Sequence, residues 1–136
     1  MIQRFALRKV QYMPTKLEPG LLYVAEKFGA AAHLCACGCG TIVRTPLNRW
    51  SLVETKFGPT LDPSIGNWQE HCQSHYWIRR GEVMWADQWT PEQIASGRRG
   101  EEERLRAYYD EFSKKKRPGA IRRFWRRLKD FVRRFV

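Results

Sequence analysis

Short apolar runs separated by turn residues dominate the first 89 positions of the chain. Apolar or β-branched runs of this length, bounded by glycine and proline, are typical of strands. The strands expected on this pattern are residues 2–12, 21–25, 41–45 and 50–55. Two further runs, 76–78 and 83–85, flank turn residues at 79–82 and predict a hairpin. We therefore expect a small, mainly antiparallel β domain over residues 1–89.

From Thr90 onwards the pattern changes to a helical one. Thr90 is a good N-cap, Pro91 suits the first helical position, and Gln93 completes a capping box. Apolar residues spaced three or four apart predict a charged helix over 101–115, with Gly97 and Gly100 interrupting the segment before it. Pro118 and Gly119 should end this helix, and an apolar stripe predicts a second one over 120–136. The expected fold class is α+β, with a helical extension over residues 90–136.

The charge of the chain is concentrated at its C-terminal end. Of the formal net charge of +11, residues 114–136 carry +10 and residues 1–113 only +1. A basic helix with an apolar stripe can dock on a partner protein, lie on an anionic membrane, bind nucleic acid, or pack on its own domain. Phosphate binding does not require an apolar stripe, so a partner protein or membrane is favoured over nucleic acid.

The sequence predicts a cytoplasmic protein, with peripheral attachment to a membrane through the C-terminal helix as an option. Neither a secretory signal nor an apolar run of the ~20 residues needed for a transmembrane helix is visible. Three of the four cysteines lie two positions apart, a spacing that disfavours disulfides between them. Thiolates that hold a metal in a reducing compartment fit this pattern better.

The four cysteines and two of the three histidines gather in residues 33–40 and 72–75. Zinc prefers four soft ligands in a tetrahedron, and the glycines at 38 and 40 suit a tight turn around the metal. The simplest ligand set is Cys35, Cys37, Cys39 and Cys72. A rival set drops one cysteine of the first segment and uses His75 in its place. His33 is the sixth potential ligand of the two segments. Thiols without a metal are the alternative to both.

A zinc ion held by four protein ligands is structural, whereas a hydrolytic zinc keeps a position for water. Neither a His-Glu-x-x-His motif nor an acidic residue close to the cysteines points to metal-activated water. Structural zinc is therefore the favoured interpretation.

Between the two cysteine segments, residues 61–68 predict a rigid loop that contains Ser64. A serine nucleophile needs a base within hydrogen-bond reach and donors for the developing negative charge. The available bases are His75 and His33, which a metal would bring towards this loop, and the amide of Asn67 is a candidate oxyanion donor. The alternative is a turn without chemistry.

Four segments of the chain resemble the bacterial domain-of-unknown-function family numbered 6527. They are residues 33–40 (His-Leu-Cys-Ala-Cys-Gly-Cys-Gly), 45–47 (Thr-Pro-Leu), 63–68 (Pro-Ser-Ile-Gly-Asn-Trp) and 72–78 (Cys-Gln-Ser-His-Tyr-Trp-Ile). The resemblance extends over residues 21–89 and leaves out the basic tail. Members of that family are encoded beside a ubiquitin-like protein and relatives of the E1 and E2 conjugating enzymes, in phage-defence operons.

The resemblance implies a peptidase that trims a ubiquitin-like precursor or removes the protein from its targets. It makes Ser64, His75 and His33 catalytic candidates and gives the cysteines to the metal. It also implies that a ubiquitin-like protein and its conjugation enzymes are the partners. The function predicted is a serine peptidase beside a structural zinc site. The alternatives are a peptidase with zinc-activated water, and a non-enzymatic zinc module that binds nucleic acid or a conjugation partner.

Overall fold

The computed structural model describes residues 1–116, and these fall into two units. The first unit is Met1–Ile94, and the second begins at Ala95. The basic helix expected over residues 120–136 lies outside the described part of the chain. Its docking on a partner protein or a membrane therefore stays a prediction.

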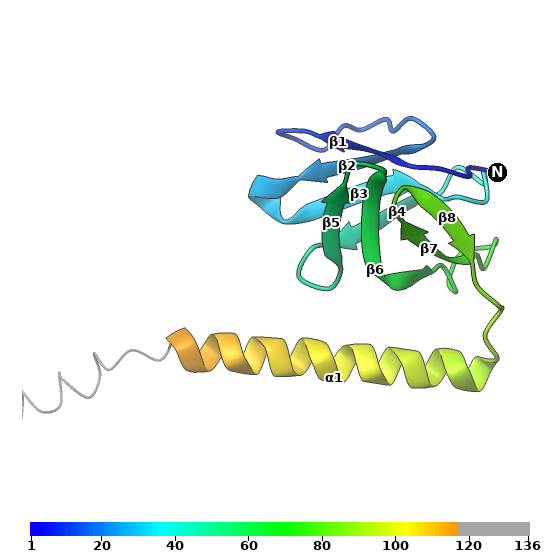
Figure 1. The fold of residues 1–136 in the computed structure, drawn as a ribbon. Helices are drawn as coiled ribbons and strands as arrows, with labels where there is room; N and C mark the ends of the chain where they lie inside the picture. Colours follow the sequence, from blue (N-terminus) through cyan, green and yellow to red (C-terminus); the bar gives the residue numbers. More distant parts are fainter. Residues whose placement is uncertain (117–136) are drawn as a thin grey trace, which may run out of the picture. The chain divides into compact units, whose positions relative to one another are not determined.

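The first sheet contains the strands nearest the N-terminus (Figure 1). It is formed by β1 (Ala6–Lys9), β2 (Leu21–Ala25), β3 (Ala30–Leu34) and β4 (Ile42–Pro46), in that order. β1 runs parallel to β2, and the other neighbours are antiparallel. A single 3₁₀ turn, η1 (Glu26–Phe28), joins β2 to β3.

The second sheet follows in the sequence and is antiparallel throughout. Its strands are β5 (Ser51–Thr55), β6 (Gly58–Gly66), β7 (His75–Arg79) and β8 (Glu82–Trp85), again in chain order. Two mainly antiparallel sheets followed by a helix confirm the predicted α+β class. The expected hairpin over 76–85 is β7 with β8.

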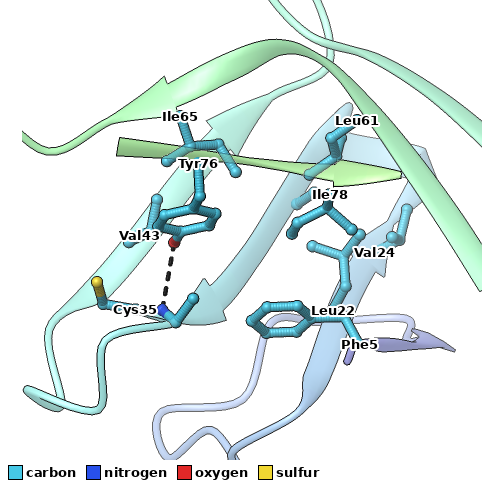
Figure 2. Close-up of a cluster of buried hydrophobic side chains, with 11 residues drawn as sticks. Phe5, Leu22, Val24, Cys35, Val43, Leu61, Ile65, Tyr76 and Ile78 are labelled. Carbon is cyan, nitrogen blue, oxygen red and sulfur yellow. Dashed lines mark hydrogen bonds between the residues drawn. The ribbon is translucent and has the colours of Figure 1, made fainter. Parts of the chain in front are cut away.

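The hydrophobic core lies between the two sheets (Figure 2). One wall comes from β2 and β4 through Leu22, Val24 and Val43, and the other from β6 and β7. The residues of that second wall are Leu61, Ile65, Tyr76 and Ile78. Removing these side chains from water stabilises the domain by about 2 kcal/mol for each large one. The core fixes β6 and β7 against the first sheet, and these two strands carry the candidate site.

The predicted strand at residues 2–12 is wrong in its extent, because the segment changes partner along its length. Phe5 donates a backbone hydrogen bond of 2.7 Å to the carbonyl of Gly81, and Arg4 bridges to Glu82 next to it. From Ala6 onwards the chain pairs instead with β2. The N-terminal segment therefore joins the edge of the second sheet to the first.

Strands β3 and β6 are two elements that the apolar pattern did not predict. β3 includes Ala30, Ala31 and Ala32, and alanine is not a strand-favouring residue. It is a strand here because two of these alanines are buried between close neighbours. β6 contains Pro59 and Pro63, which indicate turns when the sequence is considered alone.

The helix α1 (Pro91–Lys116) begins where the sequence predicts and runs without a break. The capping box is confirmed: Gln93 N donates to Thr90 Oγ1 at 3.3 Å, and Thr90 N donates to Gln93 Oε1 at 2.8 Å. The predicted interruption at Gly97 and Gly100 is wrong. Glycine costs a helix only about 1 kcal/mol relative to alanine and keeps its backbone N–H. Within residues 1–116 no helix combines the length and apolar character needed to cross a bilayer.

Candidate active site and metal centre

Ser64 lies on strand β6, where the sequence predicted a loop. The register of β6 with β7 shifts between Leu61 and Ile65, and the Asp62–Pro63 peptide in this stretch is cis. Irregularities of this kind redirect side chains and are frequent next to active sites. Ser64 is half-buried, whereas Ile65 beside it is fully in the core. Because successive strand residues point to opposite faces, the Ser64 side chain lies on the face of β6 away from the hydrophobic core.

His75, the first residue of β7, is hydrogen bonded to Ser64. Its Nε2 lies 3.0 Å from Ser64 Oγ, and its Nδ1 lies 3.0 Å from the backbone carbonyl oxygen of Asp87. A carbonyl can only accept, so Nδ1 carries the proton and donates it to Asp87. In the neutral ring Nε2 is then the acceptor, and the Ser64 hydroxyl donates to it. The structure thus sets the tautomer in which the imidazole can take the serine proton.

Three tryptophans surround the His75 ring. The centroids of Trp68 and Trp89 each lie 4.9 Å from that of His75, and the centroid of Trp77 lies 5.6 Å away. Trp68 and Trp89 also stack on each other at 5.6 Å. A Cβ on Gly66 would overlap the Trp68 indole, so the glycine makes room for this ring. The aromatic rings leave His75 only 4% exposed and restrict its orientation.

His33 is placed in the core, hydrogen bonded to a residue other than Ser64. Its Nε2 lies 2.9 Å from the hydroxyl of Tyr76, and its ring packs edge-on against Phe5 at 4.9 Å. Burial lowers the pKa of His33 to about 3, so the ring is neutral at physiological pH. The geometry therefore favours His75 over His33 as the base, and a catalytic role for His33 stays a prediction.

The four cysteines come together from two segments of the chain. Cys35, Cys37 and Cys39 lie in the turn between β3 and β4, and Cys72 lies between β6 and β7. Their sulfur atoms all lie within 4.8 Å of one another. Gly38 and Gly40 have φ angles of 88° and 82°, a left-handed backbone that lets the turn fold around the sulfurs.

The spacing of the sulfurs suits a tetrahedral metal ion. With zinc–sulfur bonds of about 2.3 Å, tetrahedral sulfurs would lie about 3.8 Å apart. Cys35 Sγ lies 3.4 Å from Cys37 Sγ and 3.9 Å from Cys72 Sγ. The Thr41 side chain lowers the pKa of Cys39 to about 6, whereas burial raises the pKa of Cys37 to about 12 when no cation is present. Four sulfur donors at this spacing fit a tetrahedral metal ion, whose positive charge would favour the thiolate form of each cysteine.

The Asn67 side chain is hydrogen bonded to the cysteine cluster. Its Nδ2 donates to Ser74 Oγ at 2.9 Å and to Cys35 Sγ at 3.4 Å, and Ser74 Oγ lies 3.0 Å from the same sulfur. Hydrogen bonds to ligating groups orient them and tune the metal. The position of Asn67 therefore fits support of the cysteines better than the predicted oxyanion donation.

Sequence reasoning missed three kinds of residue that the structure places at the site. Asp87 acts through its backbone carbonyl, which leaves no mark in the sequence. Ser74 lies between two predicted functional residues and could have been recognised only by that position. The tryptophans did leave a signal, because four of the six in the chain fall within residues 68–89, including Trp85.

In serine hydrolases, the serine hydroxyl is hydrogen bonded to one nitrogen of an imidazole, and an acceptor holds the other nitrogen. Ser64, His75 and the Asp87 carbonyl have this arrangement. Comparison with family models agrees with this class. Residues 9–86, more than half of the chain, match the BubE family, described as bacterial ubiquitination-like system serine protease, and the chain belongs to this family. Curated proteins and solved structures give no match.

The family confirms the predicted connection with a bacterial ubiquitin-like system and the predicted class of serine peptidase. The description of the matching family does not include the number 6527, so the match supports the ubiquitin-like system but not that family number. The match covers most of the β domain, including every cysteine, Ser64 and His75.

Proposed function

We propose that this protein cleaves the bond that follows the C-terminus of a ubiquitin-like protein, with Ser64 as nucleophile and His75 as general base. The reaction would either trim a precursor or release the ubiquitin-like protein from its targets. The observation that carries the proposal is the chain of 3.0 Å hydrogen bonds from Ser64 Oγ through His75 to the Asp87 carbonyl. The family's description supplies the ubiquitin-like pathway.

In this mechanism the Ser64 proton moves to His75 Nε2 as Oγ attacks the substrate carbonyl carbon. The bond from that carbon to the leaving group then breaks, and His75 gives the proton to the departing amine. Water deprotonated by His75 attacks the acyl-serine, and the proton returns to Ser64. The Asp87 carbonyl holds the imidazole in the productive tautomer throughout and stabilises the imidazolium that forms.

The oxyanion donors proposed are backbone amides of β6 and not the side chain of Asn67. The Asn67 amide already donates to Ser74 and Cys35. Backbone N–H groups close to the nucleophile are common donors to the developing negative charge.

The four cysteines are proposed to hold Zn²⁺ in a structural site. When bound, the ion would neutralise the thiolates and tie the β3–β4 turn to the segment before His75. All four tetrahedral positions would be taken by protein sulfur, which leaves none for water. This donor set is the reason to prefer serine chemistry over zinc-activated water.

The test is to incubate the full chain with the precursor of the ubiquitin-like protein encoded beside it, and to follow the intact masses. We expect loss of the C-terminal extension and covalent labelling of Ser64 by a fluorophosphonate. A protein that neither cleaves the precursor nor reacts with the fluorophosphonate is a binding module, and the proposal would then be wrong.

Replacement of Asn67 by alanine separates support of the metal from oxyanion stabilisation. We expect zinc affinity to fall about 10- to 100-fold, as is typical when a hydrogen bond to a ligand is lost. With zinc saturating, kcat should change less than about threefold, because Nδ2 is directed at Cys35 and Ser74. The measurements are competition with a chromophoric chelator and steady-state kinetics.

The matched control is Asn48→Ala, which removes the other, exposed asparagine of the chain. It should alter neither zinc affinity nor turnover. If Asn67→Ala instead slowed turnover by about two orders of magnitude at unchanged zinc affinity, Asn67 would return to the oxyanion role.

A further inference from the structure

The segment between β8 and α1, residues 86–89, carries the carbonyl that holds His75. Ala86 N donates to the His75 carbonyl oxygen at 2.9 Å, which continues the pairing of β7 with β8 by one residue. The next carbonyl oxygen along the chain, that of Asp87, lies 3.0 Å from His75 Nδ1. A backbone carbonyl cannot turn independently of its chain, because the peptide unit is planar. The direction of the Asp87 carbonyl therefore depends on what fixes the segment beyond Ala86.

Trp89 attaches the far end of this segment to the domain. Its ring stacks on that of Trp68, with 5.6 Å between the centroids and 21° between the planes. The same ring meets the His75 ring at 4.9 Å and 75°, an edge-to-face arrangement. Both geometries are favourable for aromatic rings. One side chain therefore joins the 86–89 segment to the turn after β6 and also contacts the imidazole that the segment holds.

The side chains next to Trp89 add little burial to the segment. Asp87 and Gln88 are exposed, whereas Trp89 keeps only 37% of its surface accessible. Surface segments with little buried apolar area open readily. The Trp89 ring is therefore the largest apolar group available to keep the segment on the domain.

The chain makes room for the aromatic stack at Gly66, the last residue of β6. The three atoms nearest to a Cβ built on Gly66 all belong to the Trp68 indole, which would have to move. A larger residue at position 66 would displace the ring on which Trp89 stacks. The stack can thus be disturbed from β6 without a change in the 86–89 segment.

We propose that Trp89 is a positioning residue: by stacking on Trp68 it holds the Asp87 carbonyl against His75 Nδ1, which leaves Nε2 free to accept the Ser64 proton. The inference rests on the proposed function and adds to it a residue that acts through Asp87 and His75. The family match ends at residue 86, so membership of the family does not by itself assign a role to this segment.

Loss of the carbonyl would free the imidazole to change its tautomer. With no acceptor at Nδ1, the proton can lie on Nε2, where it blocks transfer from Ser64 Oγ. In serine proteases whose acceptor is changed so that the wrong tautomer forms, kcat falls about 10⁴-fold. Without the Trp89 ring the carbonyl would be loosened but still present, so the expected loss is smaller.

Replacement of Trp89 by alanine tests this role through the kinetics of precursor cleavage. We expect kcat to fall about 10- to 100-fold and KM to change less than about threefold, because small displacements of a catalytic group act on turnover. Trp89→Phe keeps a ring that can stack on Trp68 and should recover most of kcat. The matched control is Phe57→Ala, which removes an exposed aromatic ring from the β5–β6 turn and should leave both constants unchanged.

Proton exchange at His75 tests the same role without cleavage. The Nδ1 proton is bonded to Asp87 in a ring only 4% exposed, so it should exchange slowly with water in the full chain. We expect Trp89→Ala to speed this exchange about tenfold or more, with the thermal transition retained. Nuclear magnetic resonance of the ¹⁵N-labelled protein measures the rate. The imidazole proton of His33 in the core is the internal reference and should exchange at the same rate in both proteins.

Gly66→Ala disturbs the stack while Trp89 stays in place. The added Cβ would displace Trp68, so kcat should fall about three- to tenfold and exchange of the His75 Nδ1 proton should become faster. This milder variant decides the question if Trp89→Ala does not fold. Unchanged kcat and unchanged exchange in Gly66→Ala would then overturn the inference.

The outcomes separate this inference from the proposed function. If the wild-type protein cleaves the precursor, and Trp89→Ala changes neither kcat nor the exchange rate, Trp89 has no positioning role and the serine mechanism stands. A rise in KM at unchanged kcat would make Trp89 a substrate contact and would also overturn the inference. If the wild-type protein neither cleaves nor is labelled at Ser64, the proposed function fails, and the exchange rates still show whether Trp89 holds the Asp87 carbonyl.

Discussion

Replacement of Ser64 by alanine is expected to lower kcat for precursor cleavage by about 10³-fold or more, with the fold intact. Removal of the nucleophile from a serine–histidine pair eliminates the covalent route, and only the slower contributions of binding and oxyanion stabilisation are left. The structural cost is the single hydrogen bond to His75, about 1 kcal/mol of the free energy of unfolding. Mass-spectrometric cleavage assays and thermal melting measure the two effects separately.

Matched variants make this result specific. Ser51→Ala removes a serine on the neighbouring strand and should leave kcat unchanged, and His71→Ala does the same for an exposed histidine four residues before His75. Because Ser64 and His75 act as a unit, His75→Ala should cost nearly as much as Ser64→Ala, and the double variant little more. Cleavage by Ser64→Ala at the wild-type rate would exclude the serine mechanism.

The β domain could be predicted from the sequence where apolar and β-branched residues lie between clear turn residues. β2, β4, β5 and the β7–β8 hairpin all follow that rule. β3 and β6 do not, because an alanine run and a proline-rich stretch become strands only through their neighbours in the sheets. This dependence on tertiary context is the usual reason that strand propensity fails. It concealed the fact that Ser64 lies on a strand.

The part of the candidate site that could be predicted is the part formed by side chains close together in the sequence. The spacing of cysteines and glycines indicated the metal centre, and the structure brings all four sulfurs together. The pairing of Ser64 with His75, in preference to His33, could not follow from the sequence, since both histidines adjoin cysteine segments. Both rings are buried, and their hydrogen-bond partners distinguish them: His33 Nε2 lies against the hydroxyl of Tyr76, and His75 Nε2 against that of Ser64.

The cysteine cluster and the hydrogen-bonded pair Ser64–His75 share one short segment. Cys72 is three residues before His75, and Ser74 between them contacts the sulfurs of Cys72 and Cys35. A backbone hydrogen bond from Asn67 to Ser74 closes this segment next to the end of β6. A metal ion held by the four cysteines would therefore fix where β7 begins and how the His75 ring is directed at Ser64.

Removal of the metal is accordingly expected to unfold the β domain and abolish activity together. A structural zinc site contributes about 10–16 kcal/mol, which equals or exceeds the net stability of about 5–15 kcal/mol typical of a small domain. In excess chelator the cooperative thermal transition should be lost, and re-addition of zinc should restore both the transition and cleavage. Atomic absorption should return one zinc per chain. Circular dichroism follows the fold in the same samples.

Single cysteine variants refine this expectation. Cys35 is fully buried and contacts both Ser74 and Asn67, whereas Cys39 is exposed. Cys35→Ala should therefore destabilise the domain more than Cys39→Ala, since it also leaves the Ser74 hydroxyl and the Asn67 amide without one of their partners. A melting transition unchanged by chelator would contradict the metal centre. Loss of activity in chelator with the transition intact would instead assign the metal to the chemical step.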